Sequence, residues 1–274
     1  MPILVQKFGG TSVADAARIH LAARRAIRAK LSGRQVVLVV SAMGHTTDHL
    51  IDLANQVSRK PSRREMDMLI STGEQVSIAL MAMAIHEAGH EAVSMTGAQA
   101  GMLTDSAHTR ARIRSIDARR LKEPLDQGKI VIVAGFQGVD SDFNITTLGR
   151  GGSDTTAVAL AAALQAEVCE IFTDVDGIYT TDPRIVPEAR KIGQISYEEM
   201  LELASAGAGV MHGRSIEIGK KFGVPIHVRS SFSDTAGTMI MSQTAGMEDV
   251  VVRAASIKRD VARVTLVGMP PAKG

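Results

Sequence analysis

The stretch TLGRGGSDTT, residues 147–156, decides how this chain folds. Three glycines within four residues allow the backbone to come close to a ligand, and the segment 154–165 that follows is a strong helix former. A glycine-rich loop that opens a helix points free N–H groups at an anion, and the helix dipole favours negative charge there. Arg150 adds a planar guanidinium suited to a carboxylate or a phosphate. The competing interpretation is an ordinary turn capped by Ser153 or Asp154.

Composition excludes several classes of protein. The 274 residues are 45% hydrophobic and 22% charged, as is typical of a globular chain with one large or two small domains. A net charge of +2 and only 3% aromatic residues, with no Trp, argue against a nucleic-acid partner. The single cysteine, Cys169, excludes a disulfide framework and is expected in a buried strand. No leader segment and no apolar run of about 18 residues is found, so we expect a cytoplasmic protein without a membrane partner.

Short β-branched runs alternate with helical patterns along the chain. Such alternation predicts an α/β fold with an open, mainly parallel central sheet and helices on both faces, a three-layer α/β/α sandwich. We expect one domain over 1–244 and a separate tail over 245–274. Gly73, in the middle of a helical pattern, suggests a close approach or a break. The expected strands are 3–8, 35–40, 92–95, 129–134, 168–173 and 225–229, the expected hairpin is 139–147, and the expected helices are 14–31, 48–58, 63–88, 154–165, 197–206 and 212–222.

A second glycine pair follows the first strand, in KFGGTS, residues 7–12. Lys7 at the strand end can reach a phosphoryl oxygen, Gly9 and Gly10 offer amides, and Ser12 is expected to cap the next helix. The chain has no G-x-x-x-x-G-K-[ST] loop, so phosphate must be bound in another way. Alone, Lys7 reads as a solvated strand-end lysine. Together with the 147–156 stretch, the two glycine-rich turns can face one another across a polyphosphate.

Residues 86–90 match the H-E-x-x-H pattern of zinc hydrolases. On one helix the pattern would place His86 and His90 on the same face. Gly89, however, is typical of the residue just past a helix end, so we expect His90 to lie outside the helix. We therefore expect no metal site built from protein ligands here.

The motifs, taken in order, resemble the catalytic domain of the aspartate kinases in the amino-acid kinase superfamily. The resemblance covers about residues 1–240. It departs from the family at Gly207-Ala208-Gly209-Val210, where members often carry Gly-Ala-Lys, and after 245, where only the first strand of the regulatory ACT region is recognisable. Lacking that region, the chain is expected to escape feedback inhibition by lysine or threonine. The matching segments are 7–12, 40–44 with Thr47, 69–74, 135–138, 147–156, 173–179 with 182–184, and 228–231.

The resemblance implies transfer of the γ-phosphoryl group of ATP to the β-carboxylate of L-aspartate, the first step of lysine, threonine and methionine biosynthesis. A carboxylate with a pKa near 3.9 is already ionised and needs no general base; the reaction needs positioning and positive charge. The implied catalytic residues are Lys7, assisted by the Gly9, Gly10 and Gly152 amides, and Asp154, which holds Lys7. The substrate site would comprise Glu74 on the ammonium group and Arg150 on the α-carboxylate, with Ser41, Thr47, Gly151, Gly152 and Ser153.

The nucleotide side is implied in the same way, with Mg²⁺ neutralising the β- and γ-phosphates. Its residues are Lys7, Phe8, Gly9, Gly10, Ser12, Thr173, Asp174, Tyr179, Asp182, Pro183, Arg184, Gly209 and Val210. Two alternatives stay open: a related kinase acting on another acid such as glutamate or N-acetylglutamate, and a non-catalytic nucleotide- or amino-acid-binding relative. A homodimer is also left open.

Overall fold

A single mainly parallel sheet forms the centre of the computed structural model, which describes residues 1–207, 209–242 and 254–256. Its eight strands run in the order β12-β14-β13-β9-β1-β2-β6-β3. Every neighbouring pair is parallel except β13 and β14. The strands are β1 (Ile3–Phe8), β2 (Gln35–Val40), β3 (Ala92–Met95), β6 (Ile130–Ala134), β9 (Val168–Thr173), β12 (Gln194–Ile195), β13 (Ile226–Ser230) and β14 (Thr238–Ile240).

Helices cover both faces of this sheet and bury two separate apolar cores. One face packs against α1 (Ala16–Leu31) and α4 (Thr72–Glu87). The other packs against α5 (Arg119–Asp126), α6 (Gly152–Leu164), α7 (Tyr197–Ser205) and α8 (Gly213–Phe222). Because both faces are covered, the central strands are apolar throughout rather than alternating. The predicted three-layer α/β fold is thus confirmed.

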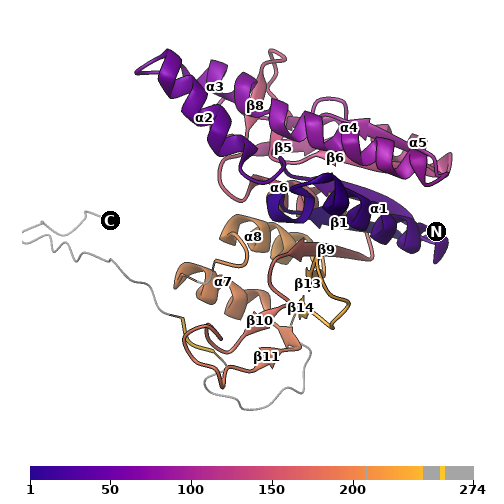
Figure 1. Ribbon diagram of the computed structural model, residues 1–274, viewed down its shortest axis with the longest axis vertical. Coiled ribbons are helices and arrows are strands. Elements are labelled where there is room, and N and C mark those ends of the chain that lie inside the picture. Colours follow the sequence, from indigo (N-terminus) through magenta and orange to yellow (C-terminus); the bar gives the residue numbers. More distant parts are fainter. Residues whose placement is uncertain (208, 243–253, 257–274) are drawn as a thin grey trace, which may run out of the picture.

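A smaller, separate sheet has the order β5-β4-β7-β8. Figure 1 shows α2 (Thr46–Val57) and α3 (Arg63–Ile70) beside β8 at one end of the molecule, and the hairpin of β10 (Ile178–Tyr179) and β11 (Lys191–Ile192) at the opposite end of the molecule. The hairpin expected over 139–147 is confirmed as β7 (Gln137–Val139) and β8 (Ile145–Thr147). The sequence analysis missed β4 (Met102–Thr104), β5 (Ile113–Ile116) and α5, which are short, and α5 contains Pro124.

The start of α1 differs from its prediction. A 3₁₀ turn, η1 (Gly10–Val13), intervenes, and the helix begins at Ala16 with the Asp15 side chain accepting a hydrogen bond from the Arg18 amide. We predicted that Ser12 caps this helix, but it does not. Its hydroxyl lies 2.5 Å from that of Ser231 instead. The prediction was wrong because the extra turn moves the free amides of the helix three residues along the chain.

The long helical pattern over 63–88 contains both features that Gly73 suggested. It is broken at Ser71, which ends α3 and begins α4. Gly73 also closely approaches the turn after β2, because a Cβ built on it would lie 2.8 Å from the Cβ of Ala42. By length and composition the segment Arg63–Glu87 could cross a membrane, but 56% of its most apolar window is buried inside the fold. That burial is what a core helix shows.

The H-E-x-x-H pattern is split by the end of α4. Gly89 has a φ of +79°, so the helix ends before it and His90 lies outside, as predicted. His86 Nε2 lies 3.0 Å from the Ala92 carbonyl oxygen. Within residues 1–207, 209–242 and 254–256, no group of three or more His, Cys, Asp or Glu side chains could hold a metal ion.

The predicted tail over 245–274 lies outside the described residues, except for Ala254–Ser256. This short piece contacts the rest of the chain: the Ala255 amide donates to the Thr180 carbonyl at 2.8 Å, and the Ser256 hydroxyl donates to the Ala206 carbonyl at 3.2 Å. The division at 244 stays a prediction. Cys169 is buried in β9, as expected.

Candidate active site

A cleft of about 290 Å³ opens at the carboxyl ends of β1 and β2. At β1 the strand order reverses direction, since β2 lies on one side of it and β9 on the other. In open α/β sheets this switch point is where ligands bind. The cleft collects both glycine-rich turns. Its lining residues are Lys7, Gly9, Gly10, Ser41, Ala42, Gly44, Thr47, Glu74, Phe136, Gly149, Arg150, Gly151, Gly152, Ser153 and Asp154.

Lys7 and Asp154 form an ion pair across the cleft. Side chains alternate along β1, so Lys7 points to the same side as Val5, toward α6. Its Nζ lies 2.6 Å from Asp154 Oδ1, and the two side chains are only 11% and 12% exposed. The structure therefore holds the lysine ammonium group beside the N-terminus of α6, in the pairing that the family resemblance implied.

The loop between β8 and α6 needs its glycines for both conformation and space. Gly149 and Gly151 have φ of +78° and +69°, a region that side chains disfavour. A Cβ on Gly151 would lie 2.3 Å from the Cβ of His212. Arg150 lies between these two glycines, where its side chain is exposed and lines the cleft.

The amides that face the cleft are not all those we expected. The Gly152 N–H donates to the Gly149 carbonyl at 2.9 Å, and the Gly9 N–H makes a long 3.4 Å bond to the Phe172 carbonyl. Both amides are thus occupied within the chain. Helix geometry instead leaves the N–H groups of Ser153 and Asp154, in the first turn of α6, without a carbonyl partner. The alternative of a turn capped by Ser153 or Asp154 is wrong, because the N-cap is Gly151 and no side chain caps it.

Glu74 lies in the first turn of α4, with its side chain buried in the cleft wall at 3% exposure. Its Oε1 accepts a hydrogen bond from the Ala42 amide at 3.2 Å, while its Oε2 is buried without a partner among the described residues. Burial raises the pKa of Glu74 to about 7, against the opposing effect of the backbone hydrogen bonds. A buried carboxylate with one unused oxygen suits a cationic group of a ligand. Ser41 and Thr47 line the same cleft.

The residues predicted for the adenine and ribose side do not line this cleft. Thr173 ends β9 and hydrogen-bonds to Asp174 at 3.1 Å. The Tyr179 hydroxyl donates to Asp176 at 2.9 Å, and Arg184 pairs with Asp182 at 2.8 Å. Asp176, through the Tyr179 hydroxyl bond and its own charge, holds the pKa of Tyr179 above its usual value. Pro183 lies in the same exposed turn.

Three further residues predicted for the nucleotide also do not line this cleft. The Phe8 ring is buried and stacks on Phe172, with ring centroids 4.8 Å apart, and the Phe8 carbonyl accepts the Ser41 amide at 3.1 Å. Val210 packs against the core beside α6 and α8. Gly209, where relatives often have Lys, is exposed.

Some cleft residues were missed by sequence reasoning. Ala42 provides the amide that holds Glu74, and Phe136, with a φ of +69°, forms part of the wall. Phe136 also accepts, through its carbonyl, the Leu148 amide at 2.8 Å. The motif at 135–138 marked this segment, but nothing in its letters indicates a left-handed phenylalanine.

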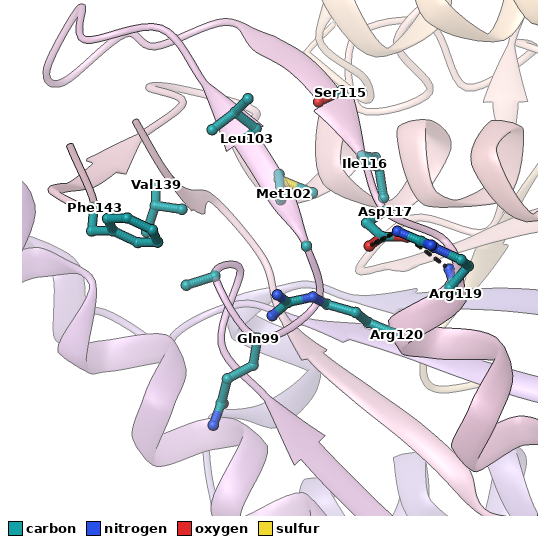
Figure 2. A pocket seen from close by; sticks show the side chains of 12 residues that line it. Gln99, Met102, Leu103, Ser115, Ile116, Asp117, Arg119, Arg120, Val139 and Phe143 are labelled. Atoms are coloured by element: carbon teal, nitrogen blue, oxygen red, sulfur yellow. Dashed lines mark hydrogen bonds and ion pairs between the residues drawn. The ribbon is translucent and has the colours of Figure 1, made fainter. Parts of the chain in front are cut away.

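A larger hollow of about 580 Å³ lies elsewhere, between the small sheet and α5 (Figure 2). Its walls are apolar residues such as Met102, Leu103 and Val139, with Arg119 and Arg120 at the rim. Arg119 is already paired with Asp117 at 2.9 Å. Neither glycine-rich turn lines this hollow. The first amides of α5, at its wall, already donate hydrogen bonds within the chain. The hollow therefore lacks the groups that phosphoryl chemistry requires.

Known proteins resemble this chain along almost its whole length. The model of the amino acid kinase family matches residues 2–230. An aspartokinase of Geobacillus stearothermophilus is 58% identical over 98% of this chain, and aspartokinase 2 of Bacillus subtilis is 56% identical over 98%. The chain spans 66% of the length of each of these relatives.

Two solved structures share the fold. The aspartate kinase of Synechocystis superposes with a TM-score of 0.80 at 53% identity, covering 91% of this chain and 41% of that one. Aspartokinase III of E. coli in complex with aspartate and ADP superposes with a TM-score of 0.81 at 30% identity, covering 89% and 65%. The family model extends over the strands and turns that build the cleft. The chain therefore belongs to the amino acid kinase family.

Proposed function

We propose that this chain carries an ATP-dependent aspartate kinase activity, which transfers the γ-phosphoryl group of ATP to the β-carboxylate of L-aspartate and gives 4-phospho-L-aspartate and ADP. The observation that carries the proposal is the charge arrangement of one cleft. It places Lys7 and the free α6 amides near Glu74 and Arg150. The identity to aspartokinases, and the aspartate and ADP bound by the E. coli relative, support the same assignment.

The chemistry requires no general base from the protein. An oxygen of the aspartate β-carboxylate, ionised at neutral pH, attacks the γ-phosphorus, and the bond from that phosphorus to the bridging oxygen of ADP breaks. The electron pair of that bond leaves with ADP. Lys7, held by Asp154, stabilises the charge that develops on the transferred group, and the Ser153 and Asp154 amides add their dipoles.

Glu74 and Arg150 orient the acceptor. The unused Oε2 of Glu74 receives the α-ammonium group, and Arg150 receives the α-carboxylate as a planar, two-pronged partner. With both ends of the amino acid held, the side-chain carboxylate is directed at the phosphoryl group. Glu74 also discriminates against N-acetylated substrates, since an acylated amine has no charge to pair with a carboxylate.

Mg²⁺ fits this cleft as part of the nucleotide. No cluster of three acidic or histidine ligands exists in the part of the chain that the structure describes, so phosphate oxygens and water must supply most of its ligands. Of the two carboxylates that line the cleft, Glu74 and Asp154, the one beside Lys7 is Asp154, and it would hold such an ion. When bound, the ion neutralises charge on the β- and γ-phosphates.

We also propose that Thr173, Asp174, Tyr179, Asp182, Pro183 and Arg184 form the adenine and ribose side, with the backbones of Phe8, Gly9 and Gly10, with Ser12, and with Gly209 and Val210. Thr173 supports this, because β9 neighbours β1 and ends at the same edge of the sheet. The other residues of the 174–184 loop follow it directly.

The test is a hydroxylamine trapping assay with ATP, Mg²⁺ and a panel of acids, in which an acyl phosphate gives a coloured hydroxamate. We expect a signal with L-aspartate and at least about tenfold less with N-acetyl-L-aspartate and L-glutamate. Equal signals with aspartate and N-acetylaspartate would contradict the role of Glu74. A signal with glutamate but none with aspartate would replace the proposed substrate.

A further inference from the structure

A buried carboxylate outside the cleft connects three segments that meet behind Arg150. Asp67, on α3, has no exposed surface. Its Oδ1 accepts the Thr147 hydroxyl at 2.6 Å, and its Oδ2 lies 2.8 Å from His108 Nδ1. Both oxygens also accept the Thr109 amide, at 3.1 and 3.0 Å. One side chain thus joins α3, the loop after β4 and the end of β8.

These contacts reach the backbone on the N-terminal side of Arg150. Thr147 is the last residue of β8, three residues before Arg150, and its carbonyl accepts the Ala111 amide at 2.8 Å. Thr109 stands against the loop itself: its carbonyl would lie 3.0 Å from a Cβ on Gly149. The position that Asp67 gives to these two threonines therefore sets where Gly149 and Arg150 lie.

The backbone of Thr109 shows that Asp67 is needed here. Thr109 has a φ of +69°, which a β-branched residue adopts only when its surroundings compensate the strain. Its amide is held by both oxygens of Asp67. Arg150, by contrast, has an exposed side chain, so its position depends on its backbone rather than on side-chain packing.

We propose that Asp67 is a positioning residue: by fixing Thr147 and Thr109 it holds the Gly149–Gly151 loop so that Arg150 faces the α-carboxylate of the aspartate substrate. The kinetic part of this inference rests on the proposed aspartate kinase function. The structural part, the loop held by Asp67, does not. When a buried carboxylate such as Asp67 fixes the loop that carries a substrate-binding arginine, that arginine is preorganised for its ligand.

The first test needs no activity. Trypsin cleaves after exposed arginines, so the rate of cleavage between Arg150 and Gly151 reports how firmly the loop is held. In Asp67→Asn we expect this rate to rise about tenfold relative to cleavage after exposed Arg184 in the same digest. Asp140→Asn is the matched control, because Asp140 is also buried and accepts the backbone amides of Asp142 and Asn144 within the β7–β8 hairpin; its further side-chain contact is with Ser106. Equal cleavage at Arg150 in both variants would overturn the proposal.

The second test uses the hydroxamate assay. Asp67→Asn should raise the KM for aspartate about tenfold or more while the KM for ATP changes less than about twofold. In an Arg150→Ala background the same substitution should have no further effect on the aspartate KM, since Asp67 acts through Arg150. Additive effects, or a lower melting temperature with an unchanged aspartate KM, would show that Asp67 serves stability alone.

A gentler substitution covers the case in which Asp67→Asn does not fold. Thr147→Val removes only the 2.6 Å hydroxyl bond, and Thr147→Ser restores it. We expect faster cleavage after Arg150 in the valine variant and recovery in the serine variant. If the wild type forms no hydroxamate on aspartate, the proposed function fails, while the cleavage rates still decide the role of Asp67.

Discussion

Two lysine–aspartate pairs lie in different regions of this molecule and have different surroundings. Lys7 and Asp154 come from β1 and α6, lie 2.6 Å apart and are 11% and 12% exposed. Lys191 and Asp176 come from the two sides of the β10–β11 hairpin, lie 3.1 Å apart and are 29% and 35% exposed. The first pair joins two elements that are far apart in sequence, whereas the partners of the second pair are 15 residues apart in one hairpin region.

The same contrast separates the two sides of the proposed site. The acceptor side is built from buried groups fixed by long-range contacts, such as Glu74 on the Ala42 amide and Asp67 on Thr147. The residues predicted for the nucleotide side pair with near neighbours, as Arg184 does with Asp182. Exposed pairs of that kind contribute about 0–1 kcal/mol, whereas removing one partner of a buried pair costs about 3–5 kcal/mol. The fold therefore preorganises the acceptor side more firmly.

The largest expected effect is at Lys7. Lys7→Ala should lower kcat by about 10³-fold, because it removes a charge that acts on the transferring group in the transition state. The matched control is Lys191→Ala, in which kcat should fall less than about threefold. Steady-state kinetics of both variants at saturating ATP and aspartate make the comparison. An unchanged kcat in Lys7→Ala would remove Lys7 from the mechanism.

A smaller effect is expected at Glu74, on binding rather than on kcat. Glu74→Gln should weaken aspartate binding by about 2–3 kcal/mol, raising its KM by about 30- to 150-fold, because the ammonium group loses its charged partner. The KM for ATP should stay within about twofold. Wild-type KM for aspartate in the glutamine variant would show that the carboxylate is not the ammonium partner.

The pH dependence sharpens the same assignment. Since the pKa of Glu74 is about 7 in the free protein, the carboxylate becomes protonated as the pH falls below 7. In the protonated form it no longer attracts the ammonium group, so kcat/KM for aspartate should decrease by up to about tenfold per pH unit below 7. In Glu74→Gln this decrease should be absent, and its persistence would assign the titration to another group.

Stability should change in the opposite direction at the same residue. A carboxyl whose pKa is raised on folding favours the protonated folded state, so the fold loses stability as the pH rises from about 4.5 to 7. Glu74→Gln removes that loss and should increase the free energy of unfolding at pH 8 by on the order of 2 kcal/mol. Chemical unfolding at pH 8 and pH 4.5 measures it; the difference should vanish at the lower pH. A glutamine variant that is less stable at pH 8 would show that the buried charge is already compensated.

The smallest expected effect is at the exposed turn. Asp182→Asn breaks the bidentate contact with Arg184, which is 89% exposed. We expect the melting temperature to change by less than about 1 °C and the KM for ATP by less than about threefold. A tenfold rise in the KM for ATP would mean that this turn is as preorganised as the acceptor side, and would break the comparison.

On the acceptor side, the sequence predicted which residues line the cleft better than it predicted which of their amides are free to donate hydrogen bonds. The two glycine-rich turns identified Lys7, Gly10, Arg150 and Asp154, and the cleft brings them together. The predicted donors Gly9 and Gly152 were wrong, because their amides are occupied by Phe172 and Gly149. Which amide is free depends on where a helix begins, and sequence patterns locate that start only to within a few residues.

The small sheet shows a different limit. β4 and β5 have three and four residues and little periodicity, so no pattern distinguishes them from loops. Asp67 illustrates the same point within a helix: nothing in the segment RREMDMLI indicates that its aspartate is buried, yet the side chain has no exposed surface. The partners that bury it, Thr147 and His108, are 80 and 41 residues away.

By itself, the sequence determined the layered α/β fold, the positions of the main strands along the chain and the two turns that face one another, because apolar periodicity and glycine placement are local properties of the chain. Only the tertiary structure decided which amides stay free, that Glu74 keeps one oxygen unused, and that Asp67 stands behind Arg150. Each of these depends on atoms brought together across many residues. Burial and hydrogen-bond partners follow from packing, which no local pattern contains.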